Sequence, residues 1–240
     1  MCQSCIDQSR RQFLTLATGA VAAGALAFGA ISAPARAAGV LPTSLDPDAA
    51  LAKLKEGNER FVKAPELCAS DLNERRELVA KGQAPWATIL ACADSRVPPE
   101  LIFGGMNLGE LFVCRNAGNT ADTDVLGTIE YGAANLGSPL VVVLGHSNCG
   151  AVKAACEVAK TGAVLPGFIG PMVDSILPAA KAEMGKEGDF LANTVRESAR
   201  LTAEKIGRQS EIVRHFVEEK KVKVVYAVYD LDTGKVDFIG

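Results

Sequence analysis

Long basic runs are absent from this sequence, and so is any excess of positive charge. No stretch of five or more Lys or Arg residues occurs, and the formal net charge is −3 at pH 7. Proteins that bind a nucleic-acid backbone usually carry a basic patch or stripe on one face. We therefore expect no nucleic-acid partner for this chain.

Internal repeats and low-complexity tracts are also absent beyond the N-terminal segment, which excludes a repeat architecture. Apolar residues make up 48% of the chain and charged residues 22%, an ordinary composition for a globular protein. A single domain of roughly 200 residues, long enough to bury a sizeable core, is the natural prediction.

The N-terminal segment differs in composition from everything that follows it. Arg10 and Arg11 precede an apolar stretch over 14–31 that is rich in Ala and Gly, and Ala35-Arg36-Ala37 forms a small-x-small cleavage site. This pattern resembles a twin-arginine export signal. A membrane-spanning anchor is the alternative, because the apolar stretch reaches the lower length limit for a spanning helix. The glycines, the alanines and the cleavage site favour removal of residues 1–37, which predicts a periplasmic domain over 38–240 without stable membrane association.

A disulfide framework is missing from the predicted mature chain. Five cysteines remain there, an odd number with irregular spacing: Cys68, Cys92, Cys114, Cys149 and Cys156. Export to an oxidising compartment normally favours disulfides. Proteins with a twin-arginine signal fold and take up their cofactor before export, so thiolates could already be bound to a metal when the chain crosses the membrane.

Helical and strand patterns alternate along the mature chain. Asp46-Pro47 is typical of a helix start, and residues 86–92 form a short apolar run typical of a strand buried on both faces. The predicted helices span about 47–62, 72–81, 123–136, 149–160, 172–184 and 191–219, and the predicted strands 86–92, 111–114, 140–144, 223–229 and 236–239. This alternation predicts an α/β fold with a mostly parallel four-stranded sheet in the order 2-1-3-4 and an antiparallel edge strand. Helices would cover both faces, with an N-terminal helical arm.

Two loops that follow predicted strands carry the residues suited to metal chemistry. Cys92-Ala93-Asp94-Ser95-Arg96 follows the first strand, and His146-Ser147-Asn148-Cys149 follows the third. In open parallel sheets the ligand site lies beyond the carboxyl ends of the strands, where the strand order reverses. Thiolate and imidazole are preferred zinc ligands, and three protein ligands leave a fourth position for water, as in catalytic sites. The His-x-x-Cys loop alone could be a structural histidine and a buried thiol, but the second loop favours zinc.

The two loops resemble the zinc motifs of β-class carbonic anhydrases, Cys-x-Asp-x-Arg and His-x-x-Cys. The resemblance continues through Gly57-Asn58-x-Arg60-Phe61, the segment 112–119, Ile129-Glu130-Tyr131 and the segment 229–234. It implies one Zn²⁺ per chain and the reversible hydration of carbon dioxide to bicarbonate. It also implies a homodimer or a larger homo-oligomer, because the family builds its active-site cleft across a subunit interface. The implied ligands are Cys92, His146 and Cys149, and the implied dyad beside the metal is Asp94 and Arg96.

Three further residues are candidates for substrate binding. Gly150 can offer its backbone N–H at the positive end of a helix to a charged substrate oxygen. Gln83 stands where some members of the family carry a glutamine that donates to the substrate, although a surface amide is the alternative. Val125 is a candidate for the apolar wall of the gas pocket, and core packing is an equal alternative for it.

Two other functions are compatible with the same motifs. Hydrolases of carbon disulfide or carbonyl sulfide resemble β-carbonic anhydrases in fold and zinc ligation. A catalytically silent zinc- or bicarbonate-binding protein is the second alternative, although the Asp94–Arg96 pair argues against it. With only two histidines in the chain, a histidine proton shuttle could only be His215.

Ile89 bears on whether the metal is accessible at neutral pH. Some β-carbonic anhydrases inactivate themselves when the aspartate moves onto the metal, and those forms carry a tryptophan three residues before the first cysteine ligand. Ile89 occupies this position here and has no N–H to support a bound bicarbonate. We therefore expect the site to stay open to water at neutral pH.

Overall fold

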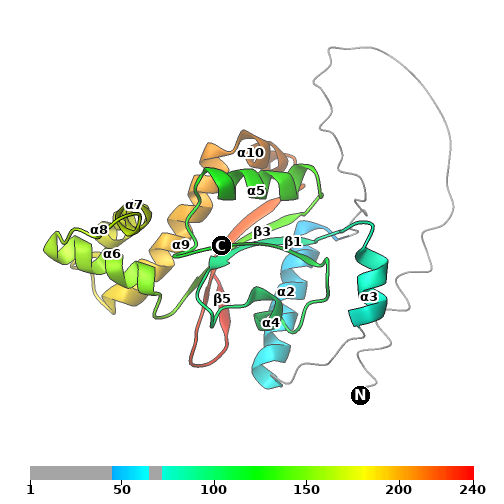
Figure 1. Cartoon of the computed structure of the whole chain (residues 1–240), viewed down its shortest axis with the longest axis horizontal. Coiled ribbons are helices and arrows are strands. Elements are labelled where there is room, and N and C mark those ends of the chain that lie inside the picture. The colour runs from blue at the N-terminus through cyan, green and yellow to red at the C-terminus, as the bar shows by residue number, and fades with distance from the viewer. Residues whose placement is uncertain (1–44, 65–71) are drawn as a thin grey trace, which may run out of the picture.

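A computed structural model describes residues 45–64 and 72–240, and its centre is one five-stranded sheet (Figure 1). The strands are β1 (Ala87–Cys92), β2 (Leu111–Asn116), β3 (Leu140–His146), β4 (Lys223–Tyr229) and β5 (Val236–Phe238). Their order is β2-β1-β3-β4-β5, and only the β4–β5 pair is antiparallel. The predicted α/β class, the 2-1-3-4 order and the antiparallel edge strand are confirmed.

The central strands β1 and β3 are buried along their whole length. Both are almost entirely apolar, the sequence signature of strands covered by helices on both faces. Trp86, predicted as the first strand residue, lies just before β1. β5 follows a tight turn in which the Gly234 N–H bonds to the Asp230 carbonyl at 2.9 Å, and Gly234 takes the positive φ of 73° that this turn requires.

Helices cover both faces of the sheet, as predicted (Figure 1). They are α2 (Pro47–Lys63), α3 (Leu72–Val79), α4 (Pro99–Ile102), α5 (Thr123–Ala134), α6 (Gly150–Thr161), α7 (Ile169–Asp174), α8 (Leu177–Glu183), α9 (Phe190–Gln209) and α10 (Glu211–Glu218). α2 and α4 pack on one face, and α5, α9 and α10 on the other. α6, α7 and α8 form a separate group beside the carboxyl ends of β1 and β3.

The predicted N-terminal helical arm consists of α2 and α3. Asp46 caps α2 by accepting a hydrogen bond from the Ala49 N–H at 2.8 Å, and a proline follows at the first helical position. Ala50 and Leu54 are fully buried against the sheet. α2 is therefore an integral part of the domain core.

Two of the predicted helices are each divided into two. The region 172–184 forms α7 and α8, with a break before Pro178, which stands in the first turn of α8. The region 191–219 forms α9 and α10, which meet at Ser210. The Ser210 hydroxyl accepts from the Val213 N–H at 3.0 Å and donates to Glu130 at 2.7 Å. Ser210 therefore starts a new helix where the apolar periodicity alone predicted continuity.

The predicted export signal over 1–37 and Cys68 lie outside the described residues. α4, which begins at a proline pair, was not predicted. Within 45–64 and 72–240, every helix falls short of the length and apolarity that crossing a membrane requires.

Candidate metal centre

The sheet topology brings three candidate ligands together at one edge. Cys92 ends β1 and His146 ends β3, and these parallel strands are hydrogen-bonded neighbours. Cys149 follows after one short turn as the N-cap of α6. Asn148 makes this turn possible by adopting a left-handed φ of 55°, which asparagine tolerates better than most residues.

The three ligand atoms are close enough to share one metal ion. The Sγ atoms of Cys92 and Cys149 are 4.0 Å apart, and all three ligand atoms lie within 4.8 Å of one another. The residues are buried, with exposed fractions of 5% for Cys92, 0% for His146 and 1% for Cys149. Among the described residues this is the one group of three or more His, Cys, Asp or Glu side chains with such spacing.

The His146 ring is oriented as a metal-binding imidazole would be. Its Nδ1 lies 2.9 Å from the Ser147 carbonyl oxygen, so Nδ1 carries the proton and donates, and Nε2 is left as an acceptor. Nε2 is buried, and the described residues give it no hydrogen-bond partner. An unpaired buried nitrogen is costly unless something binds it. Two sulfurs and this nitrogen are the donor set of a tetrahedral zinc site with one open position, so the residues fit the metal.

The two thiols act as a coupled pair. The hydrogen bond from Cys149 lowers the pKa of Cys92 from 9.0 to about 4 against the opposing effect of burial, with help from His146 and from the Gly118 N–H. The pKa of Cys149 is raised, because its thiol donates to the Cys92 sulfur and is buried. A dication bound by both sulfurs requires both as thiolates, so its binding would release any proton that Cys149 retains.

Asp94 lies beside the three ligands and is paired with Arg96. Nε of Arg96 donates to Asp94 Oδ1 at 2.9 Å and Nη2 to Oδ2 at 2.7 Å, while the Arg96 backbone N–H also donates to Oδ1 at 3.0 Å. These hydrogen bonds hold the pKa of the Asp94 carboxyl well below its usual range. Asp94 Oδ2 lies 3.9 Å from His146 Nε2. The structure therefore brings both predicted dyad residues to the ligand cluster.

Arg115 and Gly118, which the sequence analysis did not single out, also contact the Cys92 loop. Arg115 Nε donates to the Cys92 carbonyl at 3.0 Å, and its Nη2 donates to the Asp94 carbonyl at 2.6 Å. The Gly118 N–H donates to the Cys92 sulfur at 3.3 Å. The available signal was their place at the end of the second strand, since that strand lies beside the first.

The three predicted substrate-binding residues do not all lie beside the candidate ligands. Gly150 is the exposed first residue of α6, directly after Cys149, with open space where a side chain would be. Val125 is a buried residue of α5 and packs with Leu90 in the cluster between α5 and the sheet. Gln83 precedes the amino end of β1, whereas the candidate ligands lie beyond its carboxyl end. One subunit therefore does not bring Gln83 to its own cluster.

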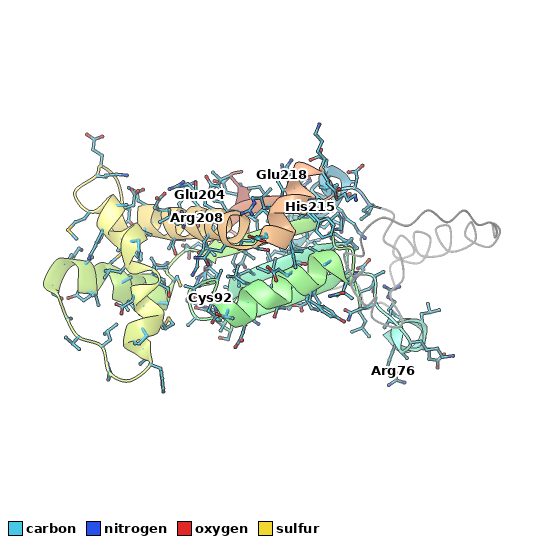
Figure 2. The ribbon with its side chains drawn as sticks, turned by 90° about the horizontal axis from the view of Figure 1, so that it is seen from above. Arg76, Cys92, Glu204, Arg208, His215 and Glu218 are labelled. Atoms are coloured by element: carbon cyan, nitrogen blue, oxygen red, sulfur yellow. The ribbon has the colours of Figure 1, made fainter. Side chains whose placement is uncertain are left out.

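The other described cysteines and His215 are not part of the group of three candidate ligands. Cys114 and Cys156 are buried free thiols. Burial raises the pKa of Cys114 to about 11. His215 lies on α10, whereas Cys92 lies between α5 and the group of α6, α7 and α8 (Figure 2). The imidazole of His215 faces Glu219 at 3.5 Å and is largely exposed.

Comparisons with known proteins agree with this geometry. The family model described as Carbonic anhydrase matches residues 87–236. The carbonic anhydrase of Mycolicibacterium smegmatis is 37% identical over 201 residues, which cover 82% of this chain and 95% of that protein. Carbonic anhydrase 2 of Mycobacterium tuberculosis is 36% identical over 202 residues, covering 81% and 95%.

The fold is similar to that of a solved β-class structure. The Coccomyxa β-carbonic anhydrase, solved in complex with acetazolamide, aligns with a TM-score of 0.61 and 27% identity, covering 82% of this chain and 87% of that chain. The family-model match over residues 87–236 includes both loops that carry the candidate ligands. The chain therefore belongs to the carbonic anhydrase family of enzymes, in its β class.

Proposed function

We propose that this protein catalyses the reversible hydration of carbon dioxide to bicarbonate and a proton, with one Zn²⁺ per chain held by Cys92, His146 and Cys149. The observation that carries the proposal is the buried, unpaired Nε2 of His146 beside two sulfurs. Its position next to the Asp94–Arg96 pair, in a chain 37% identical to a carbonic anhydrase, favours this reaction.

The metal would supply a Lewis acid that makes a water molecule acidic enough to react near neutral pH. Asp94 accepts a hydrogen bond from that water and orients it toward the carbon atom of the substrate. Arg96 holds the Asp94 carboxylate in a bidentate pair, so that it remains an acceptor for water and does not turn toward the ligands. Gly150 donates its backbone N–H to the substrate oxygen on which negative charge develops.

Gln83 and Val125 complete the proposed substrate site. Because Gln83 lies at the opposite end of β1 from the ligands of its own chain, its proposed contact with substrate requires a second subunit. This agrees with the proposed homodimer or larger homo-oligomer. Val125 would contribute to an apolar wall through its exposed edge, while most of its side chain packs in the core.

The proposed substrate is tested by offering the zinc-loaded protein carbon dioxide, carbonyl sulfide and carbon disulfide in parallel assays. Stopped-flow traces should show rapid hydration of carbon dioxide and no comparable turnover of the two sulfur compounds. Faster turnover of either sulfur compound would assign the chain to the hydrolase alternative. Zinc binding without turnover of any of the three would assign it to the silent alternative.

We also propose that residues 1–37 are a twin-arginine signal that directs the protein to the periplasm. The arginine pair, the apolar stretch and the cleavage site in the sequence support this proposal. A metal centre with two thiolate ligands fits the same route, because a zinc-loaded, folded enzyme would carry its sulfurs already bound to metal.

A further inference from the structure

Arg115 binds the backbone of the loop that carries Cys92 and Asp94. Arg115 lies in β2 opposite Ala91 of β1, next to the point where β1 ends. From there its side chain donates to two carbonyl oxygens of the adjacent loop, that of Cys92 at 3.0 Å and that of Asp94 at 2.6 Å. One guanidinium group therefore spans the segment between a candidate ligand and the candidate catalytic carboxylate.

Other hydrogen bonds hold the same segment at intermediate points. The Ala93 N–H donates to the Asn116 carbonyl at 2.9 Å, between the two carbonyls that Arg115 binds. The Asp94 carbonyl also accepts from the Val97 N–H at 3.0 Å. The backbone from Cys92 to Val97 is therefore fixed on both sides of Asp94. The Asp94 carboxylate itself contributes by accepting from the Arg96 N–H at 3.0 Å, and Arg115 contributes from the neighbouring strand.

The role of Arg115 is to fix geometry and not to balance charge, because its two hydrogen-bond partners are neutral carbonyl oxygens. No carboxylate of the described residues lies within ion-pair distance of Arg115, whereas Arg96 in the same region is paired with Asp94. The planar guanidinium offers donors in a fixed arrangement, so two acceptors bound to it are held at a fixed separation. A lysine ammonium on its flexible stem imposes no such geometry.

We propose that Arg115 is a positioning residue of the metal centre. It fixes the carbonyls of Cys92 and Asp94, so that the Cys92 sulfur stays with the other ligands and the Asp94 carboxylate stays within reach of Arg96. Arg115 acts through the loop and touches neither metal nor substrate. The inference rests on the proposed zinc site, and it names a residue that this site depends on.

Arg115→Lys tests the proposal, with Arg75→Lys as the matched control. Arg75 on α3 also donates through Nε to a backbone carbonyl, that of Leu108 at 2.9 Å, but outside the metal centre. Three quantities are measured on the zinc- or cobalt-loaded proteins. They are the rate of zinc release to an excess of chelator, the thiolate-to-cobalt absorption of the Co²⁺ form, and kcat and KM for carbon dioxide hydration.

For Arg115→Lys we expect zinc release to accelerate by about tenfold or more, the size of effect found when groups that orient metal ligands are changed. The cobalt spectrum should change, and kcat should fall by about tenfold while KM stays within about twofold. The thermal midpoint should shift no more than in Arg75→Lys. If Arg115→Lys does not fold, Arg115→Gln is taken through the same measurements, because its side chain can reach only one of the two carbonyls.

Zinc release and a cobalt spectrum that match those of Arg75→Lys would overturn the proposal. So would a lower thermal midpoint with unchanged metal properties, since that result means a structural role alone. If the unmodified protein binds zinc but hydrates no carbon dioxide, the proposed function fails. Faster zinc release from Arg115→Lys in that case still supports the positioning role, so the two failures are distinguishable.

Discussion

Arg96 binds the Asp94 carboxylate with both arms of its guanidinium, at 2.9 Å from Nε to Oδ1 and 2.7 Å from Nη2 to Oδ2. The two residues belong to one turn, and the Asp94 side chain is only 18% exposed. The carboxylate is therefore kept ionised and aimed beside the ligand cluster without joining it.

Asp94→Asn should lower kcat/KM for carbon dioxide hydration by about 10²-fold, because an amide is a weaker acceptor for the water than a carboxylate. Zinc content should stay at the level of the unmodified protein, since Asp94 is paired with Arg96. The measurement is stopped-flow hydration together with metal analysis. Asp124→Asn, an exposed acidic residue in the first turn of α5, is the control and should remain fully active. Unchanged activity in Asp94→Asn would remove Asp94 from the mechanism.

The zinc-loaded protein should keep Asp94 on Arg96 at neutral pH. The Ile89 side chain has no N–H to donate and is fully buried in the core between α2 and the sheet, so it cannot stabilise a closed form. A crystal structure of the zinc form at about pH 7.5 checks this. Activity should also fall smoothly, without a steep cooperative loss, as the pH is lowered. An Asp94 oxygen about 2.0 Å from zinc, the usual carboxylate bond length, would contradict the prediction.

Replacing Arg10 and Arg11 together by lysine should leave the precursor in the cytosol, because the arginine pair is recognised by a receptor and not by charge alone. Cell fractionation and immunoblotting measure the periplasmic share. Arg36→Lys keeps the same charge near the cleavage site and serves as the control, with normal export expected. An undiminished periplasmic yield from the double variant would exclude the twin-arginine assignment.

Gly57→Ala should destabilise the fold by about 1–3 kcal/mol, the usual cost of overpacking. A Cβ at Gly57 would clash with the carbonyl oxygen of Phe103, where α2 passes the end of α4. Gly127→Ala in α5 is the control, because a Cβ there meets nothing within 4 Å. Its free energy of unfolding should stay the same or rise by up to about 1 kcal/mol. Denaturant unfolding compares the two, and equal stabilities would show that α2 can move away from α4.

The sheet and the candidate ligands could be predicted because their signals are local. Buried parallel strands are continuous apolar runs, and Cys92, His146 and Cys149 follow two of these runs at ligand spacing. The break at Ser210 was missed because apolar periodicity continues across it, and the serine acts through Glu130, which is distant in sequence. The predicted strand order already placed the second strand beside the first, but a strand pattern does not show which side chain of β2 reaches the Cys92 loop, so the contacts of Arg115 were missed.

Cys149→Ser, assayed for zinc and for carbon dioxide hydration on the same sample, tests the central claim most directly. The unmodified protein should hold about one zinc per chain, and the variant should lose both metal and activity, because a neutral hydroxyl is a far poorer zinc ligand than thiolate. Cys156→Ser removes a buried thiol elsewhere on α6 and should keep both. Full zinc occupancy or full activity in Cys149→Ser would contradict the assignment of the metal centre.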